Sequence, residues 1–191
     1  MIYIVTGIAR SGTSMMMKAL QRGGMKAFYS HSLERKLSKT WKTRGYNANP
    51  GGYFEAGERA FDDLQFPLQH SEKVIKILVG GLHRLAVAPE GYNFLFMLRE
   101  PAEIRMSMKR LSEDNINAKN DHILMNYADI MFKFIEAMRN RRDTRSVIQF
   151  TYGEIVKEPL KHFEVLVEQG WPLDASKAAS SINPALWRMR A

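Results

Sequence analysis

The chain contains no cysteine among its 191 residues. Disulfide bonds and zinc sites with thiolate ligands are therefore excluded. Long apolar runs are also missing, because no stretch approaches the roughly 20 consecutive apolar residues of a membrane-spanning helix. A predicted strand begins at Ile2, and no secretory signal precedes it. We expect a cytoplasmic protein that is not associated with a membrane.

Acidic residues are the scarcer charged class. The sequence has 28 Lys and Arg against 20 Asp and Glu, which gives a net charge of +8. This balance favours a ligand or partner rich in phosphate, sulfate or carboxylate groups. Nucleic acid is one such partner, but the basic residues are spread along the chain without a cluster that is interleaved with aromatic residues. We therefore expect no nucleic-acid partner.

Apolar runs alternate with helical patterns along the chain. The runs that predict strands are residues 2–5, 25–29, 74–79, 93–98 and 146–151. Strands that are separated by helices pair in parallel, and their sheet is covered on both faces. We therefore predict one α/β domain over residues 1–191, a three-layer sandwich with a central parallel sheet of about five strands.

The helical patterns are clearest after the first and fourth strands. Residues 15–22 form a helical stretch that stops at Gly23-Gly24, and Pro101 stands at a suitable first helical position. A stripe of apolar residues then steps by three and four from Leu124 to Met138, which predicts one helix. Such a stripe is typical of core packing rather than of a cofactor site.

Residues 30–72 show poor periodicity. They carry five Lys and Arg between positions 35 and 44, followed by Asn49-Pro50-Gly51-Gly52. Long irregular insertions in compact domains often form lids or substrate loops, although mobile surface is the alternative. We predict that these residues form a substrate-binding insertion, and their positive charge favours an acidic acceptor.

The strongest functional signal follows the first predicted strand. Residues 7–14 read Gly-Ile-Ala-Arg-Ser-Gly-Thr-Ser and precede a predicted helix. Strand, glycine-containing loop and helix form the layout of a phosphate-binding loop, in which backbone N–H groups and the helix N-terminus bind an anion. The hydroxyls of Thr13 and Ser14 add donors to this site. The alternative is a tight turn with Arg10 as a surface cation.

The cation of this loop stands in an unusual place. A nucleotide-hydrolysing loop carries Lys where this chain has Thr13, whereas here the cation comes three residues earlier, as Arg10. This change favours sulfuryl transfer over phosphoryl transfer. A kinase of the P-loop class remains the rival, because Ser14 stands where a hydroxyl would bind Mg²⁺.

A second candidate anion site follows the apolar run at residues 94–98. That predicted strand ends at Arg99, at the sheet edge where α/β proteins bind their ligands. Ser107 lies two turns into the following predicted helix, so the two side chains suit a second phosphate group. The structural alternative is that Arg99 pairs with Glu100 or Glu103.

These two segments resemble the paired cofactor motifs of the sulfotransferase superfamily. The first is similar to its 5′-phosphosulfate loop, commonly Pro-Arg-Ser-Gly-Thr-Thr or Pro-Lys-Ser-Gly-Thr-Thr, with Ala9 in place of proline. Arg99 and Ser107 keep the eight-residue spacing of its 3′-phosphate motif. Residues 152–156 resemble its Tyr-Glu-Asp-Leu segment, and Val74-Ile75-Lys76 resembles its strand with a functional lysine.

The resemblance implies a P-loop-like α/β fold, the donor 3′-phosphoadenosine 5′-phosphosulfate (PAPS) with the product adenosine 3′,5′-bisphosphate, and no metal. The residues expected to bind the donor are Arg10, Ser11, Gly12, Thr13, Ser14, Arg99, Ser107, Tyr152 and Arg188. The C-terminal residues 183–188, which include Arg188, are expected either to cover the adenine or the 3′-phosphate or to form a docked tail.

Sulfuryl transfer needs positioning and positive charge near the bridging oxygen rather than Mg²⁺. We expect Arg10 and Lys76 to supply that charge. Lys76 lies in an apolar predicted strand, where an unpaired buried lysine is costly. The alternative is that Lys76 stands at the strand end and extends its ammonium to water.

The residue that would take the proton from the acceptor is left open. Many cytosolic members of the superfamily use a histidine two residues after the strand lysine, where this chain has Leu78. Other members use a glutamate from the region after the first helix or strand. Glu55 is preferred, because it follows a glycine turn with aromatic residues, and Glu34 and His31 are the other candidates.

We therefore predict an enzyme, a PAPS-dependent sulfotransferase that acts on a hydroxyl or amine of a small molecule, a saccharide or a peptide. One alternative is a P-loop nucleotide or small-molecule kinase. The other is a non-catalytic nucleotide-binding module that keeps the site and lacks the base. The sequence patterns carry no prediction of the oligomeric state.

Overall fold

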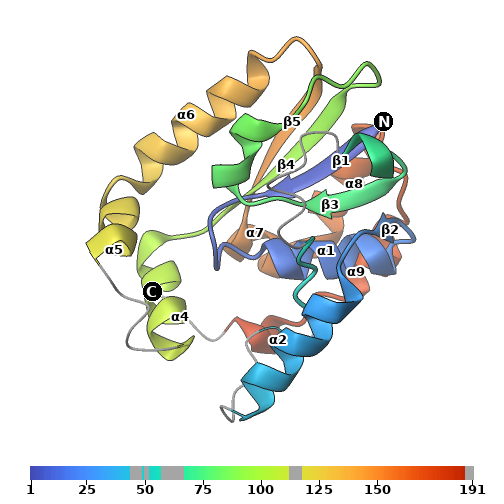
Figure 1. The fold of residues 1–191 in the computed structure, drawn as a ribbon. Coiled ribbons are helices and arrows are strands. Elements are labelled where there is room, and N and C mark those ends of the chain that lie inside the picture. The colour runs from blue at the N-terminus through green and yellow to red at the C-terminus, as the bar shows by residue number, and fades with distance from the viewer. Residues whose placement is uncertain (44–48, 50–51, 57–66, 112–117, 188–191) are drawn as a thin grey trace.

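A computed structural model describes residues 1–43, 49, 52–56, 67–111 and 118–187. Its centre is a five-stranded sheet with the order β2-β3-β1-β4-β5, and every strand pair is parallel (Figure 1). The strands are β1 (Ile2–Thr6), β2 (Lys26–Ala27), β3 (Lys73–Lys76), β4 (Tyr92–Leu98) and β5 (Thr144–Thr151). The predicted α/β architecture with a central parallel sheet is confirmed.

Helices flank this sheet on both faces (Figure 1). They are α1 (Thr13–Arg22), α2 (His31–Thr43), α4 (Pro101–Leu111), α5 (Ala118–Met125), α6 (Tyr127–Arg139), α7 (Tyr152–Lys157), α8 (Pro159–Glu168) and α9 (Ala175–Ser180). Short 3-10 turns lie at Leu68–His70, Val79–Arg84 and Pro184–Leu186. Side chains of α1, α8 and α9 pack in one core, and those of α4, α5 and α6 pack in another.

The central strands are mostly apolar because their side chains enter two separate cores. On β1, Ile2 and Ile4 belong to the core that contains Met131 of α6, whereas Val5 belongs to the core that contains Met16 of α1. All of these side chains are buried. Alternate residues of a strand point to opposite faces, so a sheet that is covered on both faces favours apolar residues on both sides of each strand. Thr6, Lys76 and Asn93 are buried polar exceptions.

Several predicted elements have different bounds in the structure, and the second strand is shortened from residues 25–29 to Lys26–Ala27. The third strand ends at Lys76, and a 3-10 turn occupies Val79–Arg84. The single helix expected from Leu124 to Met138 is divided into α5 and α6 at Asn126, whose φ is −105° and ψ is 21°. Asn126 keeps its helical backbone bonds, because its N–H donates to the carbonyl of His122 at 3.1 Å and its carbonyl accepts the N–H of Ile130 at 2.9 Å. Its side-chain amide also donates to the His122 carbonyl at 3.0 Å, so the division is a local change of backbone angle.

Residues 30–72 are more regular at their start than the sequence pattern indicated. Residues 31–43 form α2, which projects from the rest of the fold in Figure 1. Leu33 and Leu37 are half-buried, while Arg35 and Lys36 are exposed. The apolar stripe of α2 is narrow, which explains the weak periodic signal. The role of residues 30–72 as a substrate-binding insertion stays a prediction.

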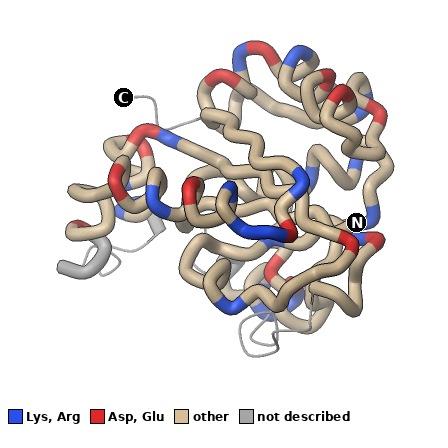
Figure 2. Tube along the Cα trace, turned by 90° about the horizontal axis from the view of Figure 1, so that it is seen from above, with Lys and Arg blue, Asp and Glu red and all other residues tan. Residues whose placement is uncertain are grey.

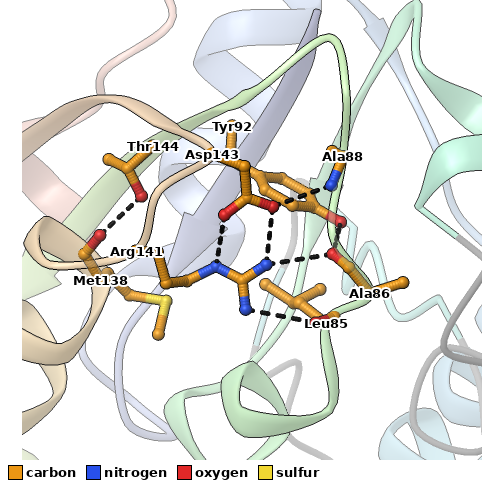
Figure 3. Close-up of polar contacts among 8 residues, drawn as sticks. All are labelled: Leu85, Ala86, Ala88, Tyr92, Met138, Arg141, Asp143 and Thr144. Carbon is orange, nitrogen blue, oxygen red and sulfur yellow. Dashed lines mark hydrogen bonds and ion pairs between the residues drawn. The ribbon is translucent and has the colours of Figure 1, made fainter.

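An ion pair at the amino ends of β4 and β5 fastens the segment before β4 to the turn after α6 (Figure 3). Arg141 donates through Nε and Nη2 to the two carboxylate oxygens of Asp143, at 2.9 and 2.8 Å. The same guanidinium donates to the carbonyls of Leu85 and Ala86, and Asp143 accepts the N–H of Ala88 at 2.8 Å. This cluster lies at the sheet edge opposite the carboxyl ends of the strands, so its role is structural.

The Asp143 cluster predicts a dependence of stability on pH. Burial raises the pKa of the Asp143 carboxyl, but the hydrogen bonds from Arg141 and Ala88 and the Arg141 charge outweigh it and lower that pKa below its ordinary value. Asp143→Asn should lower the free energy of unfolding at pH 7 by about 2–3 kcal/mol, because Arg141 loses its buried counter-ion. Urea unfolding of both proteins measures this difference.

The stability at low pH and a matched variant complete this test. A lowered carboxyl pKa stabilises the fold above the unfolded pKa, and the contribution is lost as the pH falls through the folded pKa. The difference between wild type and Asp143→Asn should therefore shrink as the pH falls below 3.8. Asp129→Asn is the control, because that carboxylate is 61% exposed in its pair with Lys133. Equal losses for the two variants would contradict the argument.

Candidate functional site

The carboxyl ends of four strands bring the predicted site residues to one edge of the sheet. β1 continues into the loop of residues 7–12, β3 ends at Lys76, and Arg99 and Tyr152 follow β4 and β5. β1 lies between β3 and β4, and the chain crosses from one side of β1 to the other between these two strands. In parallel α/β sheets this is the position at which ligands bind.

The loop after β1 turns tightly around its two glycines. Gly12 has a φ of 104°, in the left-handed region, and a Cβ atom there would lie 2.5 Å from Cδ2 of Tyr152. A Cβ atom on Gly7 would lie 2.4 Å from Oγ of Ser11 and 2.6 Å from the carbonyl of Met97. Both positions therefore require glycine, since the backbone packs directly against its neighbours.

The N-terminus of α1 is suited to an anion. Gly12 stands at the N-cap, no side chain caps the helix, and no acidic residue occupies its first turn. The first N–H groups of a helix have no partner within the helix, and the helix dipole places positive charge there. Thr13 is buried at this end, and Ser14 donates its hydroxyl to the carbonyl of Tyr53 at 3.0 Å.

The two predicted phosphate motifs meet in the structure. Nε of Arg10 donates to Oγ of Ser107 at 2.9 Å, and Nη1 of Arg99 donates to the carbonyl of Arg10 at 3.2 Å. The Arg99 guanidinium also lies over the ring of Tyr152, 4.3 Å from its centroid. The loop, α4 and the start of α7 thus form one contiguous cluster that contains two guanidinium groups, and that of Arg99 is buried.

Arg99 also makes one of the ion pairs that the sequence offered as an alternative. Its Nε donates to Oε2 of Glu103 at 2.7 Å, and both side chains are buried. Trp187 donates its indole N–H to the other oxygen of Glu103 at 3.0 Å. Within the described residues, the hydrogen bonds of Arg99 engage Nε and Nη1, and a guanidinium has further N–H donors that can bind an anion.

Lys76 is buried and surrounded by partners. Its Nζ donates to Oε1 of Glu55 at 2.5 Å, to Oγ of Ser14 at 3.3 Å and to the carbonyl of Tyr53. The side chain is only 2% exposed, so the ammonium does not extend to water. Burial lowers the pKa of Lys76 below its ordinary value, Glu55 raises it in part, and the nearby charge of Arg10 lowers it further. The predicted cation and the predicted base therefore form an ion pair.

The three candidate bases lie in different settings. Glu55 is 36% exposed and contacts Lys76. Both carboxylate oxygens of Glu34 are occupied, since they accept the backbone N–H groups of Tyr53, at 3.0 Å, and of Phe54. His31 is exposed at the start of α2, with its ring 4.8 Å from that of Tyr29. Of the three candidates, Glu55 is the one that forms an ion pair with Lys76.

Ser11 and Arg188 differ from the other predicted donor-binding residues in how the structure places them. The N–H of Ser11 donates to the carbonyl of Ile8 at 3.2 Å, and its hydroxyl is buried, so Ser11 supports the loop from the inside. Arg188 lies outside the described residues. The preceding Trp187 packs beside Gly153, where a Cβ atom would lie 3.2 Å from the indole ring, so the described tail is docked near Arg99.

Sequence reasoning missed two parts of the site, the carbonyl of Tyr53 and the carboxylate clamp of Glu34. Neither could be predicted from residue types, because each is a contact that involves a backbone group. In the described part of the chain, no three His, Asp or Glu residues gather as metal ligands. The helices of that part are also too short or too polar to cross a membrane.

The contact between Gly12 and Tyr152 gives a matched test of the loop. Gly12→Ala should destabilise the protein by more than about 2 kcal/mol, because a left-handed backbone costs about 1–2 kcal/mol for alanine and the new methyl meets the ring. Gly24→Ala should show the backbone cost alone, since Gly24 has a φ of 101° with no atom near its Cβ position. Thermal unfolding of the two variants measures the difference, and equal losses would show that the ring contact is easily relieved.

Comparisons with known proteins bear on the fold. No family model matches the sequence, and no curated protein sequence matches it. Among solved structures, the sulfotransferase domain of the olefin synthase from Synechococcus PCC 7002 is similar, with a TM-score of 0.55 and 15% identity over 100% of this chain and 88% of that chain. An unliganded sugar kinase from Janibacter sp. HTCC2649 matches with a TM-score of 0.41 and 13% identity over 96% of each chain, which is too weak for an argument. The chain therefore shares the fold of the sulfotransferase domain.

Proposed function

We propose that the protein is a PAPS-dependent sulfotransferase. The observation that carries this proposal is the hydrogen bond between Arg10 and Ser107, which joins two anion motifs that lie 97 residues apart in the sequence. Arg99 completes the junction through the carbonyl of Arg10. The shared fold with the Synechococcus sulfotransferase domain and the resemblance of the two motifs to those of the superfamily support the proposal.

The residues present fit such a donor. The N-terminus of α1, where Gly12 supplies no capping side chain, would bind a 5′-phosphosulfate beside the guanidinium of Arg10. Arg99 and Ser107 would hold the 3′-phosphate, and Tyr152 would support Arg99 through its ring. When bound, PAPS supplies an activated sulfuryl group whose leaving group is adenosine 3′,5′-bisphosphate.

The chain's own residues have two tasks in this proposal. Arg10 and Lys76 place positive charge where negative charge develops on the leaving oxygen, and the burial of Lys76 strengthens that interaction. Glu55 takes the proton from the acceptor hydroxyl or amine. Its Oε1 is fixed by Lys76, whereas Oε2 accepts no hydrogen bond from the described residues and is left for the acceptor.

The acceptor in this proposal carries acidic groups. Arg35, Lys36 and Lys39 are exposed on α2, next to the segment that bears Glu55. Their attraction for an acidic small molecule, saccharide or peptide should weaken as salt is added. Elsewhere Lys and Arg are interspersed with Asp and Glu along the chain, as Figure 2 shows, and this pattern favours such an acceptor over nucleic acid.

Donor preference is the first test. Adenosine 3′,5′-bisphosphate should stabilise the protein, by about 2.7 kcal/mol at a hundred times its dissociation constant, and 5′-AMP should do so much less. The reason is that Arg99 and Ser107 can engage a 3′-phosphate that 5′-AMP lacks. Thermal shift measures both ligands, and ATP with Mg²⁺ is the third arm. A larger shift from ATP with Mg²⁺ would favour the kinase alternative.

A serine pair supplies the matched variants for this test. Ser107→Ala removes the hydroxyl that accepts from Arg10 and should reduce the preference for adenosine 3′,5′-bisphosphate by about 0.5–1.5 kcal/mol. Ser176→Ala makes the same change on the exposed surface of α9 and should leave the preference intact. Equal shifts from the two nucleotides in the wild type would refute the assignment of a 3′-phosphate site.

The base is the second test. Glu55→Gln keeps the size of the side chain and removes its basicity, so turnover should fall by about 10²–10⁴-fold while adenosine 3′,5′-bisphosphate still binds. The measurement needs an acceptor, which a screen with labelled donor and acidic hydroxyl or amine compounds would supply.

Glu72→Gln is the control for this change, since Glu72 is 83% exposed in a long pair with Lys26. If Glu55→Gln and Glu72→Gln have the same small effect on turnover, Glu55 serves only as the counter-ion of Lys76. If the donor binds and no acceptor is sulfated by the wild type, the non-catalytic nucleotide-binding module becomes the better description.

A further inference from the structure

The start of α2 and the segment that bears Glu55 are held together as one unit. The N–H of Ser30 donates to the carbonyl of Glu55 at 2.9 Å. Glu34, in the first turn of α2, accepts the N–H of Tyr53 through Oε2 at 3.0 Å and the N–H of Phe54 through Oε1. One carboxylate thus accepts hydrogen bonds from two consecutive backbone amides just before Glu55.

The backbone that Glu34 grips is in an unfavourable conformation. Phe54 has a φ of 55°, in the left-handed region that a bulky side chain rarely adopts. Such a conformation persists only where surrounding contacts hold it. The Phe54 ring is buried and lies 5.4 Å from the ring of Tyr29, and the hydrogen bonds that the Glu34 carboxylate accepts from Tyr53 and Phe54 complete the restraint.

The conformation of the turn at Phe54 determines which groups contact Lys76. The carbonyl of Tyr53 and the carboxylate of Glu55 both contact the Lys76 ammonium, although one is a backbone group and the other a side chain two residues later. A relaxed backbone at Phe54 would direct at least one of these groups away from Lys76. The geometry around Lys76 therefore depends on the restraint at Phe54.

We propose that Glu34 is a positioning residue that acts through Glu55: it fixes the turn at Phe54 and thereby couples α2 to the Glu55–Lys76 ion pair. Arg35 and Lys36 follow Glu34 directly on α2 and are exposed. An acidic acceptor that binds there would rest on the same helix turn that places the base. The effect on turnover rests on the proposed function, whereas the structural restraint can be measured without it.

The structural part is tested by amide hydrogen exchange. Glu34→Asp keeps the charge and shortens the side chain by one methylene, so it cannot bridge both amides. Exchange of the N–H groups of Tyr53 and Phe54 should become on the order of 10-fold faster or more, because each loses a protecting hydrogen bond. Glu34→Gln keeps the length but leaves one acceptor oxygen, so at least one of the two N–H groups should exchange faster, and this variant replaces Glu34→Asp if that variant does not fold. Glu164→Asp, on the exposed surface of α8, is the matched control and should change nothing.

The functional part is tested by a double-mutant cycle with the acceptor from the screen. Glu34→Asp should lower kcat on the order of 10²-fold, as expected for a misplaced catalytic group, while the affinity for adenosine 3′,5′-bisphosphate stays within about twofold. In the Glu55→Gln background the same substitution should cost little further turnover, because Glu34 acts through Glu55.

The outcomes separate this inference from the proposed function. Unchanged exchange at Tyr53 and Phe54 in both Glu34→Asp and Glu34→Gln overturns the positioning role, whatever reaction the protein performs. The action through Glu55 is overturned if exchange is faster but kcat is unchanged. It is also overturned if Glu34→Asp lowers kcat by the same factor in the Glu55→Gln background as in the wild type. If the wild type sulfates no acceptor, the proposed function fails, and the exchange measurement alone decides whether Glu34 restrains the turn.

Discussion

A single buried ammonium organises the proposed reaction centre. The side chain of Lys76 is almost completely removed from water, and an unpaired charge in that position would be very costly. Three groups from two parts of the chain accept hydrogen bonds from it: the hydroxyl of Ser14, and the carbonyl of Tyr53 and the carboxylate of Glu55. The need to satisfy this charge fastens the segment of residues 53–55 to the end of β3 and to the first turn of α1.

The sheet topology brings the other half of the site to the same place. β1 occupies the centre of the sheet, so its loop has neighbours on both sides. On the side of β3 it meets Lys76, and on the side of β4 it meets Arg99 and Ser107. Residues that are far apart in the sequence therefore surround one helix N-terminus. Parallel pairing makes this possible, because the carboxyl ends of parallel strands share one edge.

Much of this arrangement could be predicted from local sequence. The apolar runs identified the five strands, and the glycine-containing loop and the Arg99–Ser107 spacing identified residues that the structure brings into contact. The first half of residues 30–72 was harder, since α2 has a narrow apolar stripe and its fixed point is a carboxylate that binds backbone amides. The division at Asn126 was also hidden, because the apolar pattern and the backbone hydrogen bonds of Asn126 both continue through it. Residue types carry no direct record of such contacts.

The buried pair of Arg99 and Glu103 has a consequence for how this sequence can change over time. Each side chain neutralises the other, and Trp187 holds the second oxygen of Glu103. Loss of either partner alone leaves an isolated charge in the interior, which is strongly destabilising. The two positions are therefore expected to vary together among descendants of this chain. A change of ligand at this edge of the sheet would have to pass through paired substitutions, with the position of Trp187 adapting in the same step.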